Sequence, residues 1–335
     1  MTGTVATRSV LARAERVAEE VLFPAALKTD ATGVLPPSHL DRLADEGFYG
    51  LFGPREFGGL EVDPAVGCRV VETLASGCLA TAFVWLQHHG AVKAVAASEN
   101  PGVREQWLGP LCRGARRAGT VNAALRPGPA AVRARPVAGG YILDGEVAWV
   151  TGWGHVDTLF TAARDEQDTV IWALLDAEES ATLTIKRLEL VALNASYTAN
   201  VCLSGHFVPA ERMTGTLPFA DWPARDAAGL RMNGSLALGV ADRCRRLMDP
   251  GPLTEEVAAC RARLDEADAT DLPDARAAAS ELAVRAATTL IVSSGAPSVL
   301  LSEHGQRLLR EAAVLLVFGS RRAIRDELLR RMKSR

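Results

Sequence analysis

The chain has 335 residues, a formal net charge of -3 at pH 7 and 48% hydrophobic residues. This length favours two or three packed domains over a single core. A charge so close to neutral gives no electrostatic basis for binding nucleic acid or an anionic membrane, and apolar runs such as residues 312–318 are far too short to span a bilayer. We therefore expect neither nucleic acid nor a membrane as a partner.

Residues 1–117 are predicted to form an N-terminal α-helical domain. The first 28 residues mix charged and apolar positions as an amphipathic helix does, without the uncharged core of a secretory signal, so we expect a cytoplasmic location. Asp63 followed by Pro64 is typical of a helix start, because the carboxylate can cap the helix and proline suits its first turn.

Two adjacent histidines, His88 and His89, lie on a predicted helix of this domain. An imidazole that faces a cavity could take up or release a proton near neutral pH. Only one of two adjacent helical residues can face the same cavity, and the alternative interpretation is a core histidine with satisfied hydrogen bonds.

Residues 118–217 are predicted to form a middle β domain, an antiparallel barrel or sandwich. Alternating polarity and turn glycines in residues 140–145 indicate a strand, and further strands are expected at 157–163, 170–176 and 182–188.

Residues 218–335 return to a helical period and are predicted to form a C-terminal helical bundle. The expected helices are 225–248, 254–268, 274–293, 298–316 and 319–333, with proline-containing breaks at 249–252 and 272–274. The fold class expected for the whole chain is thus α+β and multidomain.

Six cysteines are scattered through the chain without a C-x-x-C pair. We therefore expect no metal site and no disulfide framework, and we interpret all six as buried, reduced thiols.

Four segments, in order, are similar to sequences of the acyl-CoA dehydrogenase family: residues 43–60, 145–157, 193–212 and 307–320. The resemblance implies a helical domain, a β domain and a helical bundle that together hold FAD. It also implies α,β-dehydrogenation of an acyl substrate, with CoA thioesters as one substrate class, and assembly as a homodimer or homotetramer.

The resemblance assigns a flavin contact to Trp149, Val150 and Thr151, with the indole against the flavin ring and the hydroxyl near its N5 atom. The alternative is ordinary cross-strand packing, which suits tryptophan and threonine in any sheet. Leu125 and Arg126 lie in the loop that corresponds to the family's flavin-contacting loop, although residues 124–131 are shorter and lack its acid and serine.

Six arginines surround that loop and could offer phosphate contacts, or form a solvated basic face. They are Arg113, Arg116, Arg117, Arg126, Arg133 and Arg135.

Phe318 occupies the position at which most of the family has its catalytic glutamate. The other position used in the family, within residues 227–234, has no carboxylate at the matching turn. Asp226 and Glu311 are the candidate replacements, and helix capping or ion pairing is the structural alternative for both. A positioned general base contributes about 10² to 10⁴-fold to a rate.

Two other functions therefore stay open. One is a flavin-dependent monooxygenase on the same fold, with His88 or His89 near the ring. The other is a non-catalytic subunit of a hetero-oligomeric dehydrogenase whose second chain carries the glutamate.

Overall fold

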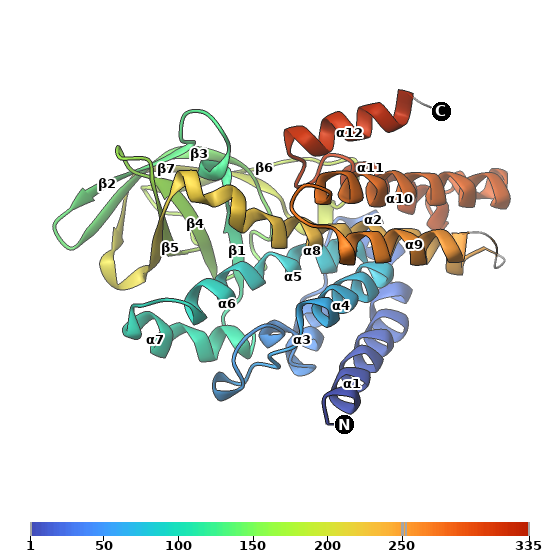
Figure 1. Cartoon of the computed structure of the whole chain (residues 1–335), viewed down its shortest axis with the longest axis horizontal. Coiled ribbons are helices and arrows are strands. Elements are labelled where there is room, and N and C mark those ends of the chain that lie inside the picture. The colour runs from blue at the N-terminus through green and yellow to red at the C-terminus, as the bar shows by residue number, and fades with distance from the viewer. Residues whose placement is uncertain (1, 249–250, 252, 334–335) are drawn as a thin grey trace.

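The computed structural model describes the backbone of residues 2–248, 251 and 253–333, and the side chains from residue 7 onward within those ranges except 227 and 228. The predicted break at 249–252 thus lies almost wholly outside the described residues. A group of helices, a sheet and a second group of helices follow one another along the chain (Figure 1).

The N-terminal part is helical, as predicted. Asp63 caps one of its helices, with its Oδ1 accepting a hydrogen bond of 2.8 Å from the Ala65 amide. A π-helical turn at Ala18–Leu22 joins the first two helices. The α-helices are α1 (Thr2–Val17), α2 (Phe23–Thr32), α3 (Pro37–Asp45), α4 (Pro64–Gly77), α5 (Leu79–Leu86), α6 (His88–Ala96) and α7 (Pro101–Cys112).

The middle part is one eight-stranded sheet in which β6, β7, β3, β2, β4, β5 and β8 follow in that order and β1 pairs with β4. The predicted strand segments are confirmed, but the sheet is mixed, since β1 and β2 both run parallel to β4. The strands are β1 (Ala118–Val121), β2 (Val132–Val137), β3 (Gly140–Val150), β4 (Thr158–Arg164), β5 (Thr169–Asp176), β6 (Leu183–Arg187), β7 (Ala199–Pro209) and β8 (Met213–Pro218).

The C-terminal part contains the five predicted helices. α11 begins six residues later than expected, because a 3-10 turn at Ala296–Val299 and a following loop occupy the start of the predicted segment. The helices are α8 (Trp222–Arg246), α9 (Leu253–Glu266), α10 (Leu272–Ser294), α11 (His304–Leu315) and α12 (Arg322–Lys333).

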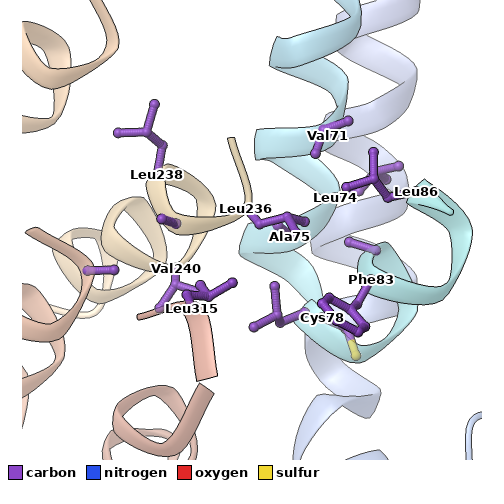
Figure 2. Close-up of a cluster of buried hydrophobic side chains, with 14 of the residues drawn as sticks. Val71, Leu74, Ala75, Cys78, Phe83, Leu86, Leu236, Leu238, Val240 and Leu315 are labelled. Atoms are coloured by element: carbon purple, nitrogen blue, oxygen red, sulfur yellow. The ribbon is translucent and has the colours of Figure 1, made fainter. Parts of the chain in front are cut away.

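The N-terminal helices pack against the bundle where α4 meets α8, and Figure 2 shows the buried side chains on both sides of this contact. Val71 and Leu74 of α4 belong to the same core cluster as Leu236 and Val240 of α8. Gly239 allows the close approach, because a Cβ there would lie 2.4 Å from the Glu72 carbonyl oxygen. The contact fixes α8 across the molecule, between the helical part and the sheet.

All six cysteines are free thiols, but the expectation that all are buried is wrong. Cys202 is exposed because it lies on β7 between Val201 and Leu203, which both point into the core, so the pleat turns its side chain outward. Among the described residues no helix has the length and apolar character needed to cross a membrane.

Candidate functional site

A cavity of about 1170 Å³ lies where the three parts of the chain meet. Its walls come from α5 and α6, from β3 and the loop after β1, from the start of α8, and from the segment that follows α11. This volume slightly exceeds the usual upper range of small-molecule sites, so the cavity has room for a large cofactor or for a cofactor with a substrate.

The sheet wall of the cavity contains Trp149, Val150 and Thr151. A register shift in the pairing of β3 with β7 falls at this point, and Trp149 adopts a left-handed backbone with φ of 69° and is 59% exposed. Val150 and Thr151 are buried. The predicted indole and hydroxyl therefore lie on the same cavity, with the indole accessible to a ligand.

Three buried hydroxyl groups form a hydrogen-bonded chain at this wall. Thr198 Oγ1 lies 3.2 Å from Thr151 Oγ1 and 2.8 Å from Ser196 Oγ, and both threonines line the cavity. Sequence reasoning selected the segment that contains Ser196 and Thr198 but assigned neither residue a role. Both residues lie just before β7, and their position beside Thr151 depends on the pairing of β7 with β3, which no local pattern shows.

The part of the cavity wall formed by the loop after β1 contains both residues predicted from that loop, Leu125 and Arg126. Leu125 is buried at the end of a 3-10 turn, whereas Arg126 is exposed. Of the six arginines in residues 113–135, only Arg126 lines the cavity. Arg117, for example, pairs with Asp41 at 2.6 Å.

The two histidines have different environments. His88 does not line the cavity: its Nδ1 accepts a hydrogen bond from the Ala118 amide at 3.0 Å, so its Nε2 is the atom that donates to the Leu111 carbonyl at 3.1 Å. Burial lowers the pKa of His88 to about 3. It is the satisfied core histidine of the alternative interpretation.

His89 lines the cavity, and neither of its ring nitrogens has a hydrogen-bond partner. Its ring packs edge to face with Phe52 and Trp85, at centroid distances of 5.1 and 4.5 Å. Burial, with smaller contributions from His88 and Lys93, lowers the pKa of His89 well below its usual value. The imidazole is therefore neutral at physiological pH.

Phe318 lines the cavity from the segment after α11, with its ring 4.5 Å from that of Phe83. The buried Arg276 donates hydrogen bonds to the Leu315 carbonyl at 3.4 Å and the Phe318 carbonyl at 3.3 Å. Sequence reasoning missed Arg276, a buried arginine of α10 whose hydrogen bonds fix the segment that presents Phe318 to the cavity.

Only one of the two candidate carboxylates lies on the cavity wall. Asp226 lines it and forms a two-pronged ion pair with Arg321, at 2.7 and 2.9 Å. Glu311 does not line it; its carboxylate is buried against Arg307, with contacts of 2.7 and 2.9 Å. Burial raises the pKa of Glu311, and Arg307 opposes that shift.

The residues present fit a flavin. One cavity combines an accessible indole, two hydroxyls at its sheet wall and the guanidinium groups of Arg126 and Arg225, which suit phosphate oxygens. Within the part of the chain that is described, no group of three or more histidine, cysteine or acidic side chains is arranged to hold a metal ion.

Residues 4–115 match the sequence profile described as the N-terminal domain of acyl-CoA dehydrogenases. Benzylmalonyl-CoA dehydrogenase of Aromatoleum aromaticum is 25% identical over 241 residues, which cover 68% of this chain and 62% of that protein. The resemblance to the acyl-CoA dehydrogenase family that the sequence predicted is confirmed by these matches. The mitochondrial short-chain specific acyl-CoA dehydrogenase of Rattus norvegicus is also 25% identical, over 59% of this chain and 50% of its own length. The chain thus matches less than two thirds of each of these relatives.

Solved structures show that the similarity in fold to acyl-CoA dehydrogenases extends over nearly the whole chain. Butyryl-CoA dehydrogenase from Megasphaera elsdenii superposes with a TM-score of 0.84 at 17% identity, covering 98% of both chains. The structure of PigA with FAD and proline gives a TM-score of 0.82 at 18% identity, covering 98% of this chain and 97% of that one. The predicted fold class is confirmed.

Proposed function

We propose that the chain is an FAD-dependent oxidoreductase that carries out α,β-dehydrogenation of an acyl thioester, with a CoA thioester as the substrate class. The observation that supports this most directly is the cavity wall that brings together Trp149, Thr151 and Thr198. FAD, when bound, supplies the acceptor for the hydride that leaves the β carbon.

In this proposal the chain's own residues hold the cofactor and take up the α proton. Trp149, Val150, Thr151 and Leu125 hold the ring system, and Arg126 offers hydrogen bonds to phosphate oxygens. Phe318 has no group that can accept a proton. Of the carboxylates on the cavity wall, Glu99 is exposed and Asp226 is half-buried, so we assign the proton acceptor to Asp226.

The test is anaerobic mixing of the flavin-loaded protein with a panel of acyl-CoA thioesters, followed by the long-wavelength flavin absorption. We expect bleaching with at least one thioester, and we expect Asp226→Asn to slow it by about 10² to 10⁴-fold while flavin binding is kept. The variant Glu311→Gln is the matched control, since Glu311 lies outside the cavity. No bleaching with any thioester would contradict the proposal.

A flavin-dependent monooxygenase is the second candidate, because the cavity wall has an apolar phenylalanine at the glutamate position and a neutral His89. In that case reduced flavin supplied to the protein would support oxygen-dependent product formation. Bleaching by an acyl-CoA in the absence of oxygen would decide against it.

We also propose a cytoplasmic protein that assembles as a homodimer or homotetramer. Support for self-association comes from exposed apolar side chains that follow one another at the end of α10 and beyond it: Val292, Val299, Leu300 and Leu301. Light scattering on the purified chain measures the assembly. Co-purification with a second dehydrogenase-like chain would instead favour the hetero-oligomer.

A further inference from the structure

One face of α6 presents two polar side chains to the cavity, His89 and Lys93. They are four residues apart on a helix, so they lie on the same side, one turn from each other. Neither residue is used in the proposed dehydrogenation.

Lys93 is a cation without an ion-pair partner among the residues that the structure describes. Its Nζ lies 4.1 Å from the centroid of the Phe52 ring, a contact that attracts a cation without neutralising its charge. The two carboxylates of the cavity do not pair with it: Asp226 is bound by Arg321, and Glu99 has no ion pair with Lys93. Lys93 is exposed as a whole residue, and the partial burial of its side chain lowers its pKa.

The unpaired state of His89 is a second, independent indication that a polar group binds here. Its side chain is 2% exposed and both ring nitrogens lack partners. A buried polar group left unpaired destabilises the fold, and such groups in native proteins are uncommon. A neutral imidazole always carries one N–H, so His89 can donate one hydrogen bond to a group that enters the cavity.

The cavity wall changes character along α5 and α6. It begins with Phe83, which contacts Phe318, continues with Leu86, and becomes polar from Gln87 onward, at His89 and Lys93. An acyl chain that lies along the apolar part would bring its far end to the two polar residues.

We propose that His89 and Lys93 bind a carboxylate at the end of the acyl chain remote from the thioester. The substrate class is then a thioester of a dicarboxylic acid, and this inference rests on the proposed function above. Lys93 supplies the opposite charge, and His89 supplies a hydrogen bond that fixes the carboxylate's position.

The test compares glutaryl-CoA with pentanoyl-CoA. Their acyl chains have the same length, but glutaryl-CoA ends in a carboxylate and pentanoyl-CoA ends in a methyl group. Binding to the flavin-loaded protein is measured by the perturbation of the flavin spectrum. We expect glutaryl-CoA to bind at least about tenfold more tightly, as a charge-assisted contact in a cavity gives. Lys93→Met should remove this preference and leave pentanoyl-CoA binding unchanged.

Two variants separate recognition from structure. His89→Gln keeps a hydrogen-bond donor and should retain most of the preference, whereas His89→Phe should reduce it. Lys186→Met, an exposed lysine on β6 outside the cavity, is the matched control and should keep the preference.

A second readout makes the test independent of thioester recognition. Glutarate, but not butyramide, should raise the unfolding temperature of the protein, and Lys93→Met should abolish the rise. If no thioester binds but glutarate still raises the unfolding temperature, the result contradicts the proposed function and supports the carboxylate site. Equal binding of the two thioesters, or no glutarate effect when no thioester binds, would overturn the carboxylate site.

Discussion

At the scale of single residues, Trp149 is held in an unfavourable backbone conformation that also makes it available to a ligand. A φ of 69° is rare for a bulky residue and costs on the order of 1 kcal/mol or more. Because the indole is 59% exposed, its burial offsets little of that cost. Such strain is typical of residues kept for binding rather than for stability.

Replacing Trp149 with glycine should therefore weaken cofactor binding without unfolding the protein. Glycine relieves the backbone strain but loses more entropy on folding, so we expect the free energy of unfolding to change by less than about 1 kcal/mol. The dissociation constant for FAD should rise about tenfold as the aromatic contact is lost. Urea denaturation and flavin fluorescence measure the two quantities.

Trp149→Phe keeps an aromatic ring and the strained backbone, and should bind FAD nearly as well as the unchanged protein. A large loss of stability in Trp149→Gly with unchanged FAD binding would show that the indole is a packing residue.

The sequence predicted some site residues and missed others for a physical reason. Trp149 and Thr151 could be found because they are two residues apart at the end of β3, within a resembling segment. Lys93, Thr198 and Arg276 could not, because each reaches its position through contacts between distant segments, such as the hydrogen bond from Arg276 to the Phe318 carbonyl.

At the scale of secondary-structure elements, α11 contains a buried ion pair whose two charged groups contact each other instead of water. Arg307 and Glu311 are one turn apart, and their side chains are only 1% and 3% exposed. A buried charge that loses its partner has no water to compensate it. Because this pair lies outside the cavity, Glu311 is not available as a base for a substrate bound there.

Glu311→Gln should lower the free energy of unfolding by about 3 kcal/mol, because it leaves the Arg307 charge uncompensated. Activity per folded molecule should stay unchanged, since Glu311 does not line the cavity. Glu303→Gln, at an exposed position before α11, should change stability by less than about 0.5 kcal/mol. A variant that is stable but inactive would instead assign Glu311 a catalytic role.

Element types and their order could be predicted from the sequence because helical and strand periods are local. The Asp63 cap and the strand segments of the middle part are examples. The parallel pairing of β1 and β2 with β4 could not be predicted, because strand direction within a sheet depends on which strands meet, and that is decided by the whole chain. The late start of α11 has a local cause, since Gly295, with φ of 70°, ends α10 and Pro297 belongs to a 3-10 turn.

At the scale of the whole molecule, burial lowers the pKa of every histidine. The residues are His39, His88, His89, His155, His206 and His304. A depressed pKa means that the unfolded chain binds protons that the folded chain does not. Stability is therefore complete above the unfolded pKa of about 6.5 and is lost progressively as the pH falls below it.

We expect the free energy of unfolding to fall between pH 7.5 and pH 5. His88 alone, with its pKa lowered to about 3, should account for about 2 kcal/mol of that loss. His88→Gln can keep both hydrogen bonds and should make the pH dependence shallower. Denaturation at both pH values measures the difference, and an identical slope in the variant would contradict the assignment.

The account as a whole depends on the cavity being a flavin site. Titration of the purified, flavin-free chain with FAD, followed by flavin fluorescence and by the absorption band, tests this most directly. We predict saturation at one FAD per chain, with binding weakened in Trp149→Gly and retained in Glu311→Gln. Absence of saturable binding, or binding that is the same in both variants, would contradict the assignment of the cavity.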